Sequence, residues 1–288
     1  MARNLPILAV QATSRTGEAG LDAFESELEA LLSDFPQTKL VVYPEIHLCG
    51  VSGTPQERGA ALVEAAQPLE GPRIERLSAV AQRLGVWLMP GTVCESAGGG
   101  KVYNTAPVFS PRGELAATYR KCFPWRPFEP YVPGDAFTVF DIPDIGRVGL
   151  AICYDIWFPE VARQLAWMGA EVILNPAQTS TCDREKEKTL VQANAIFNQV
   201  FVVSINAAAP AGTGQSLIAD PEGNVRVSLP SESPAIMTDV LNLEEVERVR
   251  RFGTCGLNRM WAQFGKEDAP LELPLYNGAI DPRTWGGR

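Results

Sequence analysis

Short apolar runs rich in β-branched residues alternate with stretches of helical periodicity along most of the chain. The apolar runs predict strands, and turn sequences such as PRG (111–113) and DPEG (220–223) separate some of them. The strands that this pattern predicts cover residues 6–11, 40–43, 86–93, 105–110, 115–120, 148–153, 172–175 and 201–206.

Between the expected strands, apolar residues recur every three or four positions, which is typical of amphipathic helices. Leu21, Phe24 and Leu28 show this spacing, as do Ile74 and Leu77 with the residues up to 84. Two further helices are expected over 159–168 and 185–199. Strands and helices that alternate in this way favour one layered α/β domain, which we place over residues 1–251.

The last part of the chain, residues 252–288, breaks the alternation. It is rich in Pro, Gly and Trp and contains apolar residues without a clear period. Because such a segment would bury little of its apolar surface on its own subunit, we expect it to pack on a neighbouring subunit.

Composition narrows the class of protein. The 288 residues are 45% hydrophobic and 20% charged, as in ordinary globular proteins, and no apolar run approaches the roughly 20 residues of a membrane span. The net charge of −9 disfavours binding to nucleic acid. The apolar stretch 5–10 is shorter than the core of a signal peptide, so we expect a cytoplasmic protein.

The counts of cysteine and histidine limit the possible chemistry further. Six cysteines lie far apart without CxxC pairs, which predicts free thiols rather than a disulfide framework or a zinc site. His47 is the only histidine, so a histidine-rich metal site is excluded. We interpret His47 as a local hydrogen-bonding group rather than a catalyst, and we expect no metal or cofactor.

Three of the expected strands end at a residue with reactive chemistry: Glu45, Lys121 and Cys153. In α/β proteins the ends of strands are where ligands bind, so a carboxylate, an ammonium and a thiol could converge there. Each has a simpler interpretation, since a cysteine is often inert and buried and a single charge usually faces solvent. Together they supply a nucleophile, a general base and a cation for an oxyanion.

These motifs resemble the nitrilase superfamily of carbon–nitrogen hydrolases. The resemblance covers most of the chain and rests on LPILAVQAT, YPEIHLCG, YRKCFPWRPFEPYVPGD and GLAICYDIWFPE. It implies that Glu45 is the general base, that Lys121 stabilises the tetrahedral intermediate and that Cys153 forms a thioester. It also implies a four-layer αββα sandwich that continues across a dimer, in a homodimer or higher homo-oligomer.

The segment 119–134 is most similar to the aliphatic amidase and formamidase branch, which implies that Glu129 is a second catalytic carboxylate. Independently, Pro124, Pro127, Pro130 and Pro133 recur at every third residue, the repeat of a polyproline II helix. Such a loop would present an aromatic wall and one carboxylate rigidly. The alternative is a proline-rich surface loop without a role in the site.

Departures from related motifs bear on the substrate. Tyr154 follows the cysteine where nitrilases commonly have Trp, which favours an amide over a nitrile, and Trp157 replaces an arginine found in relatives that cleave carboxylate-bearing amides. We therefore expect a small, neutral amide, bound by Tyr154, Trp157, Trp125 and Arg126, although Arg126 could replace the missing cation. Alternatives are a nitrilase, an N-carbamoyl amide hydrolase and a non-catalytic binding protein.

Overall fold

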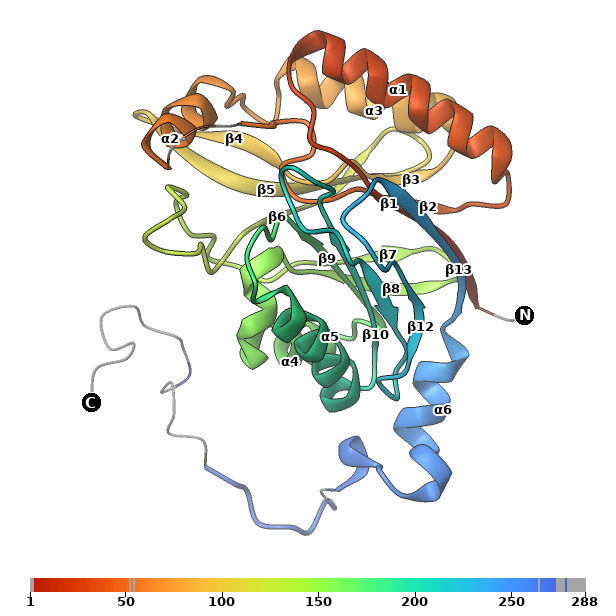
Figure 1. Ribbon diagram of the computed structural model, residues 1–288. Helices are drawn as coiled ribbons and strands as arrows, with labels where there is room; N and C mark the ends of the chain where they lie inside the picture. Colours follow the sequence, from red (N-terminus) through yellow and green to blue (C-terminus); the bar gives the residue numbers. More distant parts are fainter. Residues whose placement is uncertain (1–2, 52, 54, 264, 273–277, 279–288) are drawn as a thin grey trace.

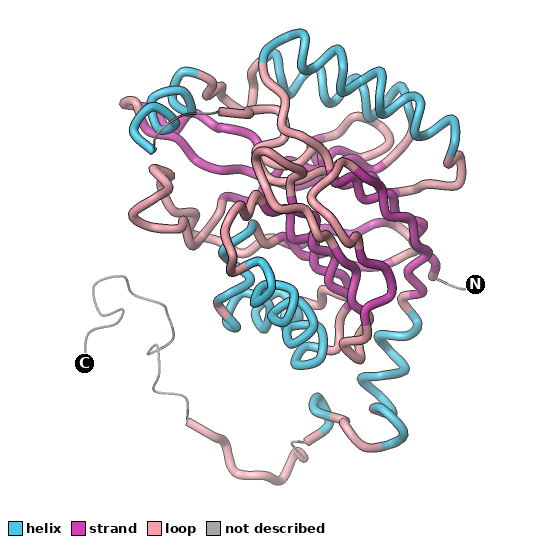
Figure 2. Tube along the Cα trace, viewed as in Figure 1, coloured by secondary structure: helices cyan, strands magenta, loops and turns pink. Residues whose placement is uncertain are grey.

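Two facing β-sheets with helices on both outer sides make up the molecule (Figures 1 and 2). The computed structural model describes residues 3–51, 53, 55–263, 265–272 and 278. The layers follow the order helix, sheet, sheet, helix, so the expected αββα sandwich is confirmed. The continuation across a dimer stays a prediction.

Seven described strands form the first sheet, in the order β13-β1-β2-β3-β5-β4 with β6 paired to β5. The strands β1 to β3 are parallel, and their short apolar sequences suit a sheet that is covered on both faces. Their bounds are β1 (Asn4–Gln11), β2 (Leu40–Val42), β3 (Trp87–Met89), β4 (Val93–Gly98), β5 (Lys101–Phe109), β6 (Leu115–Arg120) and β13 (Ala235–Asn242).

Six described strands form the second sheet, in the order β12-β11-β10-β9-β8-β7. The central strands β8, β9 and β10 are parallel, so their carboxyl ends lie at the same edge. The bounds are β7 (Val139–Ile142), β8 (Gly146–Leu150), β9 (Val172–Ala177), β10 (Phe201–Asn206), β11 (Leu217–Ala219) and β12 (Val225–Ser228).

The helices bury the apolar faces that their spacing predicted. In the first outer layer, α1 (Gly17–Asp34) and α3 (Pro72–Leu84) place Phe24 and Leu77 in one core with Leu8 of β1, and α2 (Pro55–Glu64) adds Leu62. In the second outer layer, α4 (Pro159–Trp167) and α5 (Arg184–Asn198) pack on the second sheet. The helix α6 (Glu244–Phe252) follows β13 (Figure 1).

The space between the sheets is filled by a third apolar core. Ile7 and Val42 of the first sheet meet Leu150, Leu174 and Val203 of the second in this layer. All five side chains are essentially buried, which ties the two sheets rigidly together. Loops that leave the two sheets at the same end are therefore held in a constant relation.

The structure corrects several sequence predictions. The predicted strand 86–93 is two strands, because Pro90 and Gly91 interrupt the run between β3 and β4, and the predicted strand 148–153 already ends at Leu150. The sequence pattern also assigned no element to β7, β11, β12, β13, α2 and α6, and it reached β4 only at Val93. The strands β12 and β13 bury few of their side chains, so their sequences lack a clear apolar period.

The tail begins on its own subunit. Trp261 lies under the guanidinium groups of Arg163 and Arg250, and Gln199 donates a hydrogen bond to the Asn258 carbonyl at 2.7 Å. Residues 265–272 are exposed, and most residues beyond them lie outside the described part. Packing of the tail on a second subunit stays a prediction. No described helix has the length and apolar character that a bilayer crossing requires.

Candidate active site

Glu45 lies in a tight loop directly after β2 and is 2% exposed. The loop is fixed by its neighbours, since the Ile46 amide donates to the Thr92 hydroxyl at 2.9 Å and the Glu45 amide donates to the Ala177 carbonyl at 3.4 Å. The bond from the Glu45 amide joins the loop after β2, in the first sheet, to the end of β9, in the second sheet. The apolar sequence before Glu45 forms a buried strand, so the carboxylate is carried into the interior.

Lys121 directly follows β6 and is completely buried. Its backbone amide donates to the Asn104 carbonyl at 2.9 Å, so the pairing of β5 with β6 continues to this residue. The Asn104 side chain in turn donates to Glu45 Oε1 at 2.7 Å. The position of β5 between the two loops therefore sets the separation of the carboxylate from the ammonium.

Cys153 lies between β8 and a short 3₁₀ helix, Cys153–Trp157, and its φ of +47° is in the left-handed region. A non-glycine residue held in that region costs free energy and is a marker of functional sites. The chain turns sharply here from strand to helix, and Pro159 starts α4. The turn directs the thiol away from the apolar strand that precedes it.

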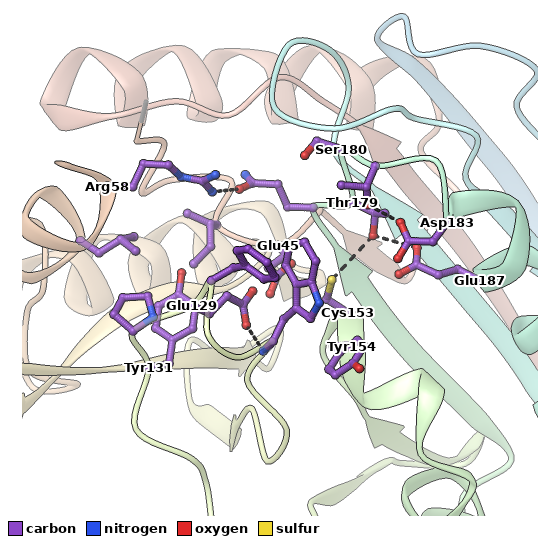
Figure 3. Close-up of a pocket in the computed structure, with 17 residues that line it drawn as sticks. Glu45, Arg58, Glu129, Tyr131, Cys153, Tyr154, Thr179, Ser180, Asp183 and Glu187 are labelled. Carbon is purple, nitrogen blue, oxygen red and sulfur yellow. Dashed lines mark hydrogen bonds between the residues drawn. The ribbon is translucent and has the colours of Figure 1, made fainter. Parts of the chain in front are cut away.

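Glu45 and Cys153 line the pocket that Figure 3 shows, together with Glu129, whereas Lys121 is not part of the lining and is completely buried against the two carboxylates. Lys121 Nζ donates to Glu45 Oε1 at 3.0 Å, and it also donates to Glu129 Oε1 at 2.9 Å and Oε2 at 2.8 Å. Cys153 and Glu45 both line the pocket, and the two groups are near enough for the Glu45 charge to raise the pKa of the thiol. A thiol and a carboxylate thus line the pocket, and an ammonium is hydrogen-bonded to that carboxylate.

Burial and charge set the protonation of these groups. Burial raises the pKa of Glu45 above 4.5, although the Lys121 charge opposes this rise. Burial lowers the pKa of Lys121, but the charges of Glu45 and Glu129 more than offset it, so the net pKa is well above its ordinary value. Burial and the Glu45 charge raise the pKa of the Cys153 thiol. At neutral pH the structure therefore holds an ammonium beside an ionisable carboxylate and a protonated thiol.

The loop that carries Glu129 differs from its predicted polyproline II form. The amides of Phe128 and Glu129 both donate to the Trp125 carbonyl, at 3.0 and 2.9 Å, which makes a turn, whereas polyproline II has no internal hydrogen bonds. The turn brings the Trp125 amide to Glu129 Oε2 at 2.7 Å. The prediction of the loop's conformation was wrong, and a hydrogen-bonded turn presents Glu129 to Lys121.

Asp155 joins the loops that carry Lys121 and Cys153. Its buried carboxylate accepts hydrogen bonds from the Ile152 amide at 2.8 Å, the Phe123 amide at 2.9 Å and the Tyr119 hydroxyl at 2.8 Å. Burial raises the pKa of Asp155 to about 6, while the Ile152 amide opposes the rise. Because its donors come from β6, the following loop and the end of β8, this residue aligns the two sheets at the site.

The pocket itself has a cavity volume of about 80 Å³. This is about half of the roughly 150 Å³ that accommodates benzene in an engineered apolar cavity. Trp125 and Tyr154 line it, as expected, together with Leu62 and Phe128. An acyl chain of few carbon atoms fits such a space.

Two residues expected at the substrate do not line the pocket. Arg126 is exposed and lies outside the lining, and Trp157 is half-buried behind it. The indole N–H of Trp157 donates to Glu187 Oε1 at 3.3 Å. The structure therefore gives no support to Arg126 as a replacement for the arginine that relatives have at the position of Trp157.

A buried polar network forms the wall on the other side of Cys153. Thr179 Oγ1 lies 3.7 Å from Cys153 Sγ and donates to Glu187 Oε2 at 2.7 Å (Figure 3). Arg184 pairs with the same Glu187 oxygen at 3.1 Å. The charged run 183–188 favours a solvated helix face by its sequence, but only Glu185 and Lys186 are exposed there, and Arg184 and Glu187 are buried.

Sequence reasoning missed Asn104, Asp155, Thr179 and Glu187. Asp155 could have been found from the sequence, because it lies in an apolar segment two residues after the expected nucleophile. A carboxylate buried in such a segment needs hydrogen-bond partners, which points to a structural role. Glu187 lies among like charges, so its burial could not be found from the local sequence.

His47 and the remaining cysteines are separate from the pocket lining. His47 is buried and stacked on Tyr43 with ring centroids 4.7 Å apart, and within the described residues neither ring nitrogen has a hydrogen-bond partner. The expectation that it forms local hydrogen bonds was wrong, because the apolar layer around α1 surrounds it. All six cysteines are free, as predicted. Across the described ranges, no cluster of His, Cys, Asp and Glu could hold a metal ion.

Comparison with known proteins gives consistent matches. A family model described as carbon–nitrogen hydrolase matches residues 9–251. An (R)-stereoselective amidase from Pseudomonas sp. is 31% identical over 254 residues, which span 86% of this chain and 88% of the relative. An omega-amidase from Xenopus tropicalis is 34% identical over 203 residues, 65% of this chain and 72% of the relative. The structure of Saccharomyces cerevisiae Nit3, a nitrilase-superfamily member, superposes with a TM-score of 0.78 and 27% identity, covering 86% of this chain and 94% of Nit3.

Proposed function

The chain belongs to the carbon–nitrogen hydrolase family, and from this premise we propose that it hydrolyses a small, neutral carboxamide through a thioester on Cys153. The observation that carries the proposal is that Cys153 and Glu45 line one pocket while Lys121 donates to Glu45 at 3.0 Å. The three arise from loops of two different sheets, and each is backed by its own set of hydrogen bonds.

The first half-reaction forms the acyl-enzyme. Cys153 Sγ attacks the carbonyl carbon while its proton passes to Glu45, whose pKa is raised by burial and so suits a general base. The carbonyl electron pair moves to oxygen, and the Lys121 ammonium with the backbone N–H of Tyr154 stabilises the oxyanion. Collapse of the intermediate breaks the C–N bond, and the proton on Glu45 leaves with ammonia.

The second half-reaction hydrolyses the thioester and returns the proton to Cys153. Water gives a proton to Glu45 as its oxygen attacks the thioester carbon, and Lys121 again faces the oxyanion. The C–S bond then breaks, the thiolate takes the proton back from Glu45, and the carboxylic acid departs. One carboxylate acts as base and acid in turn, so the site works without its single histidine.

The pocket favours a neutral acyl group. Leu62, Trp125 and Phe128 provide apolar contacts, whereas Asp183 and Glu187 add negative charge to the lining. Trp157 donates its N–H to Glu187 and so gives no cation to a substrate carboxylate. Arg58 also lines the pocket, but it is exposed and donates to Gln178 at 3.5 Å, so an anionic acyl chain would meet mainly like charges in a confined space.

The test compares substrates of equal length. The kcat/KM for ammonia release from butyramide should be at least about ten times that from succinamate, from an N-carbamoyl amine or from butyronitrile. Replacement Cys153→Ala should abolish release, and acid quenching of the unaltered protein should leave a butyryl group on the peptide that contains Cys153. Equal rates in the Cys153→Ala protein would refute the mechanism, and a preference for succinamate would refute the substrate class.

A further inference from the structure

Glu187 is a buried carboxylate that the proposed reaction does not use. It lies in the first turn of α5, and its side chain is 4% exposed. Three groups donate to it: Thr179 at 2.7 Å, Arg184 at 3.1 Å and Trp157 at 3.3 Å. A carboxylate built into the wall beside the nucleophile with three partners has a defined orientation.

The Thr179 hydroxyl connects Glu187 with the sulfur. Its backbone is held on both sides by Asn206, which accepts from the Thr179 amide at 2.7 Å and donates to the Thr179 carbonyl at 3.0 Å. The hydroxyl has a single proton, and the charged Glu187 oxygen at 2.7 Å competes for it against Cys153 Sγ at 3.7 Å. Since the charged and nearer acceptor forms the stronger bond, the hydroxyl turns its lone pairs toward the sulfur.

The other charged groups that face Cys153 come from three more segments. Glu45 follows β2, Lys121 follows β6, and Glu129 lies on the loop after it. Burial raises the pKa of the thiol, the Glu45 charge raises it further, Lys121 lowers it, and Glu187 and Glu129 raise it. A thiolate at this position would face three carboxylates, one ammonium and the lone pairs of Thr179.

We propose that Glu187, acting through Thr179, is a positioning residue that withholds a hydroxyl proton from the sulfur and so keeps the Cys153 thiol protonated until substrate arrives. The sulfur then loses its proton to Glu45 only as the bond from sulfur to carbon forms. In the absence of substrate the protonated thiol reacts more slowly with oxidants and other electrophiles than a thiolate would. The inference takes from the proposed function only that Cys153 is the nucleophile.

The test measures the pH dependence of thiol modification in the absence of substrate. Methyl methanethiosulfonate is small and neutral; the thiolate attacks its sulfenyl sulfur, a methyl disulfide forms and methanesulfinate leaves. The extent at Cys153 is read from the mass of its peptide, because exposed Cys182 and Cys255 also react. Replacement Glu187→Gln removes a negative charge, so the midpoint pH should fall by about one unit.

Thr179→Val gives a second, sharper readout. In the unaltered background it removes lone pairs that face the sulfur, so the midpoint should fall. In the Glu187→Gln background the hydroxyl is free to donate to the thiolate, so the same replacement should raise the midpoint. If Glu187→Gln does not yield folded protein, Thr179→Val alone tests the inference. The inference predicts that its midpoint pH falls, whereas the loss of a hydroxyl that donated to the sulfur would raise the midpoint pH.

The controls separate this role from structural damage. Thr179→Ser keeps the hydroxyl and should keep the midpoint, and Glu185→Gln removes an exposed carboxylate of the same helix and should leave it unchanged. An unchanged midpoint in Glu187→Gln, or the same sign for Thr179→Val in both backgrounds, would overturn the inference. Since no turnover is involved, a failure of amide hydrolysis would sink the proposed function and leave these results intact.

Discussion

At the residue scale, the site depends on one buried ammonium shared by two carboxylates. Lys121 contacts Glu45 on one side and Glu129 on the other, and it is completely shielded from water. Without this cation the buried Glu45 carboxylate would face the half-buried Glu129 carboxylate with no opposite charge between them, and the two would repel each other. Burial raises the pKa of Glu45 above 4.5, so Glu45 becomes protonated and loses its function as a base at a pH above 4.5. As the pH is lowered from neutral, activity should therefore decline before pH 4.5 is reached.

Glu129→Gln tests the second carboxylate. The amide oxygen can take the place of Oε2, which accepts from both Lys121 and Trp125, but the NH2 group then replaces Oε1 as the second acceptor for Lys121, so at least one charge-assisted hydrogen bond of about 1.5–3 kcal/mol is lost. We expect kcat for the amide to fall by roughly 10-fold to 100-fold with little change in KM, measured by steady-state ammonia release. Glu114→Gln, which alters an exposed carboxylate, is the control. Wild-type kcat in Glu129→Gln would exclude a role for this residue.

At the element scale, loops rather than strands hold the reactive groups, and each loop is supported by a neighbour. The segment between β3 and β4 supports the Glu45 loop: Thr92 accepts the Ile46 amide, and Gly91 lies against Pro44. Gly91 has a φ of +89°, and a Cβ there would lie 2.0 Å from the Pro44 carbonyl oxygen. The close approach requires glycine, and it fixes the depth at which Glu45 enters the site.

Gly91→Ala should therefore displace the Glu45 loop. We expect a fall in the melting temperature together with a loss of kcat of at least about 10-fold, because small shifts of a catalytic group have large effects on rate. Gly85→Ala provides the matched control, since Gly85 also has a positive φ, of +67°, but nothing lies within 4 Å of its Cβ position. It should cost only about 1 kcal/mol of stability and leave kcat unchanged. Equal kcat in both variants would contradict this account.

At the scale of the whole molecule, the apolar core under α1 encloses one buried imidazole, that of His47, against Phe24 and Tyr43. Burial lowers the pKa of His47 from 6.5 to about 3, with a smaller contribution from Arg15. The folded protein therefore holds the ring neutral, whereas the unfolded chain binds a proton below pH 6.5. Stability from this neutral ring is complete above pH 6.5 and is lost as the pH falls toward about 3.

His47→Phe should remove that dependence, because Phe fits the stack against Tyr43 and binds no proton. The free energy of unfolding of the variant relative to the parent protein should rise by about 2 kcal/mol between pH 7 and pH 5, measured by urea denaturation. Other groups titrate equally in both proteins and cancel in the difference. Parallel stability curves would show that the ring is protonated or solvated in the folded state.

The amino-acid sequence determined the kinds of element and the kinds of chemistry. Its apolar periods predicted the helices around Phe24 and Leu77 and most central strands, and its strand ends pointed to Glu45, Lys121 and Cys153. The resemblance to the carbon–nitrogen hydrolases is confirmed by the family match. These features are local, since a few residues with a regular spacing specify which face of an element is buried.

Only the tertiary structure decided which buried faces meet. Glu45 and Lys121 follow strands of the first sheet and Cys153 follows one of the second, and their encounter depends on how the sheets stack. The same packing put Glu187 inside, although it lies in a charged run, and left Arg126 outside, although it lies among aromatic and proline residues. It also left the His47 ring nitrogens without a hydrogen-bond partner among the described residues, and it set the direction of each pKa shift, because burial and charged neighbours arise from residues far apart in the chain.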